Sequence, residues 1–159
     1  MTDEAFALDK TQLRAVMKAF KAMDEQAQTE AKNQTGQISD FARSRIIDKS
    51  HSLNTSRVAA SRIAEGSKVK KSSKIGEITF GYIGQKFSGG GDTKQLWGGF
   101  EFGSNKYKQF PVWSGRKGRG SRGWFIYPTL REIQPEVVAR WTDAFSRVLK
   151  EWLWLNPER

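Results

Sequence analysis

The chain has no cysteine and only one histidine among its 159 residues. The absence of cysteine excludes disulfides, thiolate catalysis and cysteine-ligated zinc, and it fits synthesis in a reducing cytoplasm. No apolar run approaches the roughly 20 residues that a membrane-spanning helix requires, so we expect no membrane partner. The first ten residues, MTDEAFALDK, are acidic, unlike the basic and then apolar start of a secretory signal.

Recognisable catalytic and cofactor-binding motifs are also lacking. His51 lies in a polar stretch with no partner pattern around it, which favours a solvated loop residue. The three glycines at 89–91 are not followed by the Lys-Ser/Thr pair of a phosphate-binding loop, so we interpret them as a flexible loop. Glu77, Asp92 and Glu101 show no spacing that argues for paired catalytic carboxylates. We therefore expect no enzyme, no cofactor and no metal site.

What the chain does have is positive charge, and it is concentrated in the middle. Residues 66–131 contain 13 Lys and Arg against 3 Asp and Glu, while the remaining residues hold 14 of each. The whole net charge of +10 therefore lies in the central span, together with 14 of the 15 glycines. Such a distribution favours a polyanion or an acidic protein surface as partner.

The size of 18.0 kDa predicts a single domain over residues 1–159, and sixteen Trp and Phe rings suffice for its core. Within it we expect a helical N-terminal region (1–65), a sheet with basic loops (75–131) and a C-terminal helix (135–155). The predicted fold class is α+β: a small antiparallel sheet flanked by N-terminal helices and a C-terminal helix, with long basic, glycine-rich loops.

Apolar residues at helical spacing predict three helices in the N-terminal region. The first runs from about 10 to 32, begins after Asp9, and ends where the sequence at 33–36 interrupts the pattern. A second helix is predicted over 38–49. Asn54 or Thr55 can cap a third helix, which Gly66 would end in the left-handed conformation.

In the central region the spacing of apolar residues changes from that of a helix to that of a strand. Residues 67–74 form a polar connector, residues 75–83 predict a strand, and residues 87–92 form a loop. Residues 96–102 fit either a strand with glycine kinks or a short helix. Residues 124–127 predict a strand that Pro128 ends.

The C-terminal helix should begin at Pro135, since proline needs no N–H in a first helical turn. Apolar residues then recur at helical spacing up to Trp152. From this helix and the preceding strand we assign five aromatic residues to the core: Trp124, Phe125, Tyr127, Trp141 and Phe145.

The segment 103–131 organises the chain. Between Gly103 and Trp124 it carries six cations and no acidic residue; the cations are Lys106, Lys108, Arg116, Lys117, Arg119 and Arg122. Basic residues interleaved with glycine and aromatics are typical of loops that contact phosphates. The same residues could instead dock on an acidic neighbouring subunit, and composition leaves the two partners open. We expect the glycine-rich residues 85–122 to become ordered only on assembly.

Several short strings resemble one family. They are Phe100-Glu101-Phe102-Gly103-Ser104, then Phe110-Pro111, then GWFIYPTLR at 123–131, then Pro135-Glu136 and Trp141. In this order they resemble the tail-completion or neck (head–tail connector) proteins of long-tailed bacteriophages, the lambda Z-like minor tail components. The resemblance covers residues 55–152, and residues 1–54 only by pattern.

The resemblance implies a virion structural protein at the head–tail junction, made in the host cytoplasm. Such proteins are similar in fold to tail-terminator subunits and form a ring, commonly of six copies, between the stopper and the tail terminator. It implies no catalytic residue and no cofactor. The implied partners are other copies of the chain, the adjacent stopper and terminator proteins, and genomic DNA in the lumen. The alternatives are a sequence-independent nucleic-acid-binding protein, or a terminator or stopper at another level of the neck.

Overall fold

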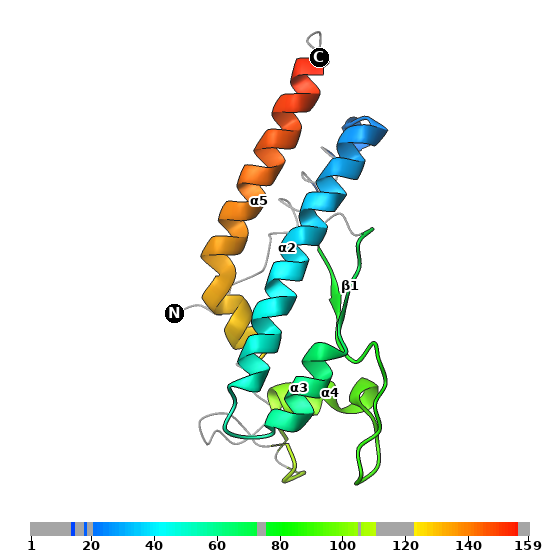
Figure 1. Cartoon of the computed structure of the whole chain (residues 1–159), viewed down its shortest axis with the longest axis vertical. Helices are drawn as coiled ribbons and strands as arrows, with labels where there is room; N and C mark the ends of the chain where they lie inside the picture. The colour runs from blue at the N-terminus through cyan, green and yellow to red at the C-terminus, as the bar shows by residue number, and fades with distance from the viewer. Residues whose placement is uncertain are drawn as a thin grey trace.

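The computed structural model describes Arg14, Lys18 and residues 21–72, 76–104, 106–110 and 123–155 of the chain (Figure 1). Its elements are α2 (Glu25–His51), α3 (Arg57–Glu65), β1 (Lys68–Val69), β2 (Ile78–Thr79), α4 (Thr93–Phe102) and α5 (Tyr127–Leu155). β1 and β2 pair antiparallel, with Lys68 opposite Thr79 and Val69 opposite Ile78. The fold is α+β, as the sequence predicts, and the helices account for most of it.

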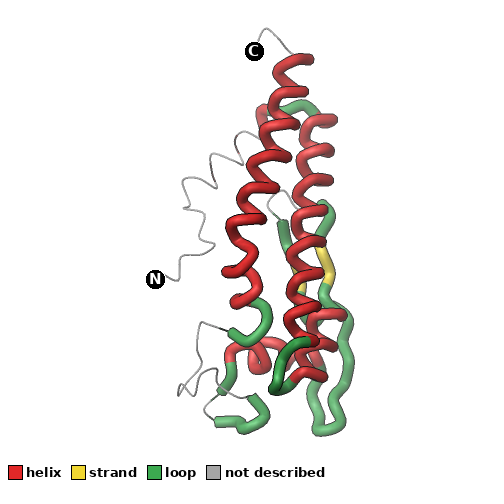
Figure 2. Tube along the Cα trace, turned by 60° about the vertical axis from the view of Figure 1, so that its left-hand side comes forward, coloured by secondary structure: helices red, strands yellow, loops and turns green. Residues whose placement is uncertain are grey.

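Two long helices form the frame of the molecule. α2 and α5 lie side by side and run antiparallel, and together they make an elongated body (Figures 1 and 2). α3 and α4 pack on each other near the C-terminal end of α2, and β1 contacts α2. The start of α5 therefore lies at the same end of the body as α3 and α4.

The buried face of α2 consists mainly of small residues. Their spacing of three or four keeps them on one side of the helix; they are Ala27, Ala31, Thr35, Ser39, Ala42, Ile46 and Ser50. Small side chains allow another helix to approach closely. The hydroxyl of Thr35 donates to the carbonyl oxygen of Ala31 at 2.9 Å, so this buried polar group is satisfied within the helix.

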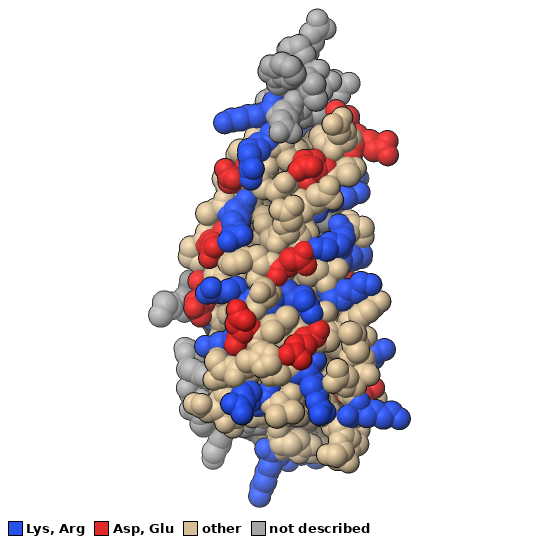
Figure 3. Space-filling model, in the orientation of Figure 1, with Lys and Arg blue, Asp and Glu red and all other residues tan. Residues whose placement is uncertain are grey.

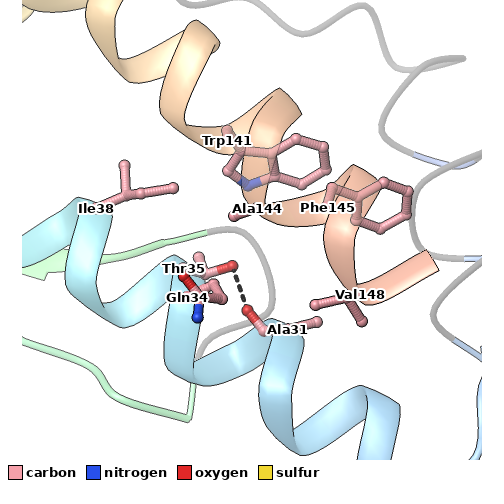
Figure 4. A pocket seen from close by; sticks show the side chains of 8 residues that line it. All are labelled: Ala31, Gln34, Thr35, Ile38, Trp141, Ala144, Phe145 and Val148. Carbon is pink, nitrogen blue, oxygen red and sulfur yellow. Dashed lines mark hydrogen bonds between the residues drawn. The ribbon is translucent and has the colours of Figure 1, made fainter. Parts of the chain in front are cut away.

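Across from this face, α5 contributes large rings (Figure 4). Trp141 and Phe145 stack with their centroids 5.0 Å apart and an angle of 9° between the planes. Both rings are only half-buried, while the neighbouring Ala144 and Val148 are buried. Phe145 packs against the cluster of Met23, Ala27, Ala31 and Val148. The two rings thus line the edge of the α2–α5 contact and are not enclosed by it.

The main core lies at the other end of the body. It consists of Ile46, Ala60, Ile63, Ala64, Phe125 and Ile126. Of the aromatic residues assigned to the core from sequence, Phe125 is fully buried here, and Trp124 is half-buried against this cluster. Tyr127 is 45% exposed, so its assignment to the core is wrong. It occupies the first position of α5, and its ring lies 5.3 Å from that of Phe102.

The predicted break at 33–36 is wrong, because α2 runs through it. Arg14, Lys18, Lys21 and Ala22 have helical backbone, but the boundary between helices falls at Met23 and Asp24. There the Asp24 side chain accepts from the N–H of Ala27 at 2.8 Å and caps α2. The predicted second helix, 38–49, is the later half of α2.

The third helix is present as α3, but its ends differ from the prediction. Its N-cap is Ser56, whose side chain makes no capping bond, and not Asn54 or Thr55. Gly66 has φ −80°, so it does not end the helix in the left-handed conformation. Glycine is favoured at this position because the chain packs closely there. A Cβ on Gly66 would lie only 3.0 Å from the carbonyl oxygen of Arg62.

The central region is more helical than predicted. Residues 96–102, left open between strand and helix, belong to α4, whose N-cap is Asp92. The connector at 67–74 contains β1, and the strand predicted over 75–83 is limited to β2. The loop predicted at 87–92 is present, with the isolated bridge between Lys86 and Asp92 at its base.

The strand predicted at 124–127 is wrong, because residues 124–126 form a bend and Tyr127 begins α5. Pro128 stands in the first turn of α5, where its missing N–H is tolerated. Pro135 does not begin the helix but lies inside it. Since an internal proline cannot donate to the carbonyl four residues back, it bends the helix. Figure 1 shows the first turns of α5 at an angle to the remainder.

Candidate functional site

A buried glutamate joins the end of α4 to the start of α5. Glu101 is fully buried, and its carboxyl oxygens accept hydrogen bonds from three consecutive backbone N–H groups. Oε2 accepts from Phe125 at 3.0 Å and from Ile126 at 2.9 Å, and Oε1 accepts from Tyr127 at 2.9 Å. The N–H groups at the start of a helix lack acceptors within the helix. The carboxyl group of Glu101 provides acceptors for the N–H groups that lead into α5.

Gly123 is required next to this carboxyl group. Its φ of +71° lies in the left-handed region, which disfavours other residues. A Cβ at this position would also overlap with Oε1 of Glu101 and would lie 3.3 Å from Cδ of Pro128. The glycine therefore allows the chain to turn directly over the glutamate. We call the set of Glu101, Gly123 and the N–H groups of 125–127 the glutamate joint.

The pKa of the Glu101 carboxyl lies above its ordinary value, because burial disfavours the charged form. The hydrogen bonds from the backbone N–H groups of Ile126, Phe125, Tyr127 and Trp124 oppose this rise. The effect of burial on the pKa is larger than the combined effect of these hydrogen bonds. Every side-chain acceptor of Glu101 is nonetheless used for structure, which leaves the group bound to the backbone and not directed toward a substrate.

The chain that follows α4 folds back on this helix. The N–H of Ser104 donates to the carbonyl oxygen of Phe110 at 2.8 Å. The buried ring of Phe110 lies edge-on to Phe100 at 5.0 Å, and a Cβ on Gly99 would come within 2.9 Å of it. The expectation that residues 85–122 order only on assembly is therefore wrong for 93–104 and 106–110, since these residues form α4 and a packed turn.

Two of the six predicted contact residues fall in this turn. Lys106 and Lys108 are exposed, and Nζ of Lys106 lies 5.2 Å from the centroid of the Tyr107 ring. Arg116, Lys117, Arg119 and Arg122 lie outside the described residues. What the structure establishes is the geometry of both ends of the basic segment: it begins after Gly103 and ends before Gly123, and the glutamate joint holds these two ends together.

His51 is the last residue of α2 and not a loop residue. Its Nε2 lies 2.7 Å from Oε1 of Glu65, and its Nδ1 lies 3.4 Å from Oγ of Ser61. The imidazole thus lies between a serine and a glutamate, as in a catalytic set of nucleophile, base and orienting acid. However, the Ser61 hydroxyl donates to the carbonyl oxygen of Arg57 at 2.7 Å, so its proton is directed away from the imidazole. The contacts fasten the end of α2 to α3.

The described ranges also bear on metal binding and on membrane insertion. They contain no group of three or more histidine, aspartate or glutamate side chains placed to hold a metal ion. Over the same ranges, no helix combines the length and the apolar character needed to cross a membrane.

Replacing Glu101 by glutamine tests the joint. The amide keeps the shape, but its NH₂ group must face at least one of the backbone N–H groups at 125–127. Since a buried donor without an acceptor costs about 1–3 kcal/mol, we expect Glu101→Gln to lower the free energy of unfolding by about this amount in urea titrations. The control is Glu77→Gln, which removes an exposed ion pair with Lys70 and should cost less than about 1 kcal/mol. Equal losses would contradict a structural role for Glu101.

The pH dependence of stability provides a second test. Because the native pKa of Glu101 is raised, the folded protein binds more protons than the unfolded chain at pH values between the ordinary pKa of 4.5 and the native one. The free energy of unfolding should therefore fall as pH rises through this window. The Glu101→Gln variant lacks this carboxyl group and its pH dependence. As pH rises through the window, the wild type should lose stability, and the difference in free energy of unfolding between wild type and variant should become smaller. A widening difference would show that the N–H bonds and the dipole of α5 outweigh burial.

Comparisons with protein-family models, with curated proteins and with solved structures found no match for this chain.

Proposed function

We propose that the chain is a structural subunit of a long-tailed bacteriophage virion, which forms a ring at the head–tail junction and completes the tail. The observation that carries the proposal is a coincidence of sequence and geometry. The strings that resemble the neck family, Glu101-Phe102-Gly103 and GWFIY at 123–127, are the two halves of the glutamate joint. The residues that carry the resemblance are thus the residues that hold together the two ends of the basic segment.

The arrangement suits a subunit that joins to its neighbours through one segment. A closed ring needs a head-to-tail contact, in which one surface of each copy meets a different surface of the next. The glutamate joint belongs to the main core, because Phe125 and Ile126 are members of both. A force on a contact made through residues 104–122 would therefore be transmitted to the main core of the subunit. The six cations of this segment favour acidic surfaces of neighbouring proteins, with lumenal DNA as a second partner.

The runner-up is a free protein that binds nucleic acids without sequence preference. The excess of 13 basic over 3 acidic residues in 66–131 favours it. Electron microscopy of the purified protein separates the two functions. Rings with a central channel would support the neck subunit, and a monodisperse monomer that binds duplex DNA would support the runner-up. A ring that stacks on tails or on heads would also distinguish tail completion from the stopper and terminator levels.

Removing charge from the basic segment tests its part in joining. Arg119→Gln combined with Arg122→Gln should block the joining of tails to heads in vitro, counted as infectious particles, because the cations no longer attract an acidic neighbour. The folded subunit should keep its unfolding temperature. The matched control is Arg45→Gln with Arg147→Gln, which removes two exposed arginines that already pair with Glu132 and Asp143. Normal joining by the Arg119/Arg122 variant would contradict the proposal.

A further inference from the structure

A second group of cations lies away from the basic segment, in a part of the chain whose acidic residues are all engaged. Residues 57–110 contain four carboxyl groups. Glu65 contacts His51, Glu77 pairs with Lys70 at 3.4 Å, Asp92 caps α4, and Glu101 is buried in the glutamate joint. Among the described residues, the lysines at 68 and 94 have no acidic partner within ion-pair distance. Their charge is therefore not neutralised within that part of the subunit.

Lys68 contacts an exposed tyrosine, Tyr82, and the backbone of Lys94 lies close to the neighbouring Gly81. Nζ of Lys68 donates to Oη of Tyr82 at 3.1 Å and lies 4.5 Å from the centroid of its ring. The pKa of Tyr82 lies below its ordinary value, because Lys68 donates this hydrogen bond and the charges of Lys68 and Lys94 favour the phenolate. All three side chains are exposed. We call them the Lys68–Tyr82–Lys94 surface.

The backbone holds this surface in place. Thr93 is fully buried; its hydroxyl donates to the carbonyl oxygen of Ile83 at 2.9 Å and accepts from the N–H of Gln85 at 3.0 Å. Gly81 has φ +70°, and a Cβ there would lie 2.8 Å from Cα of Lys94. The chain at 81–85 is thus fastened against the start of α4, which fixes Tyr82 near Lys94.

The magnitudes favour a phosphate polymer over an acidic protein as the partner. Exposed pairs between lysine and a carboxylate contribute only about 0–1 kcal/mol each, so two of them would hold a protein partner weakly. On a nucleic acid the same two lysines release condensed counterions, and tyrosine hydroxyls also donate to phosphate oxygens. Among the charged side chains along the edge of the body where β1 and the following loop lie, Figure 3 shows more lysine and arginine than aspartate and glutamate.

We propose that the Lys68–Tyr82–Lys94 surface binds the phosphate backbone of a double-stranded nucleic acid, independently of residues 104–122. The contact needs no base recognition, since lysine and tyrosine meet only phosphate oxygens. The proposal goes beyond the ring function, because it assigns a ligand to a surface outside residues 104–122, the segment through which we propose that subunits join.

The test compares two pairs of exposed lysines; Lys94 lies at the start of α4, and the other three lie in β1 or directly after it. Lys68→Gln with Lys94→Gln removes two cations for which the described residues provide no ion pair, while Lys70→Gln with Lys71→Gln removes cations already paired with Glu77 and Asp40. All four lysines are exposed, so both variants should keep the fold, as circular dichroism would verify. Binding to a 20-base-pair DNA duplex and to an RNA duplex of equal length is measured by fluorescence anisotropy over a range of salt concentrations. Each phosphate contact contributes about 0.9 to the slope of log K against log salt.

The Lys68/Lys94 variant should reduce this slope by about 1.8, and the Lys70/Lys71 variant by less than half as much, because a paired lysine releases fewer counterions. A preference for one duplex would identify the natural nucleic acid. Three results would overturn the proposal: equal changes in the two variants, no binding of either duplex by the wild-type protein at low salt, or equally tight binding of polyglutamate. Rings seen by electron microscopy would be unaffected by any of them, so the two proposals fail separately.

Discussion

The hydrogen bonds that Glu101 accepts from the backbone N–H groups at 125–127 are the interaction on which the rest of the structure depends. They connect two helices whose sequences are separated by the basic segment. They also place Phe125 and Ile126 in the main core beside Ile46 and Ile63. A buried polar group is costly unless each of its atoms is bonded, so the joint has little freedom to shift. The positions of α4, of the start of α5 and of both ends of the basic segment therefore follow from one side chain.

The α2–α5 pair extends from this joint along the length of the body. Its contact is made by small residues on α2, such as Ala31 and Thr35, facing Ala144 and Val148 on α5. Pro135 bends α5 shortly after the joint. The direction of α5 from the glutamate joint and its course along α2 are consequently set by two separate features, a capped start and an internal proline.

Much of the fold class could be predicted from sequence, because the helices carry strong local signals. The boundaries could not. The predicted break at 33–36 assumed that a buried helical face needs large apolar residues. Instead, α2 buries Thr35, whose hydroxyl donates to the carbonyl oxygen of Ala31, and Ser39, which lies beside Gly76. The apolar string at 124–127 has high strand propensity, but three of its N–H groups are taken by Glu101, which a local pattern cannot reveal.

The structural role of Glu101 was not predicted from the sequence. Two signals could have found it: a lone acidic residue among the aromatics of LWGGFEF, which must find donors if it is buried, and Pro128, which fits the first turn of a helix. The six cations between 104 and 122 were predictable as a group, but their partners were not, since charge alone does not distinguish phosphate from carboxylate.

The proposed subunit thus combines a packed body with a basic segment whose ends are fixed by one buried carboxyl group. Native-state hydrogen exchange at the amides of Phe125, Ile126 and Tyr127 tests this most directly. If Glu101 accepts from all three, they should exchange only through global unfolding, with protection equal to that of the core amides of α2. Exchange of these three amides as fast as that of exposed loop amides would show that the joint does not form, and would contradict the account.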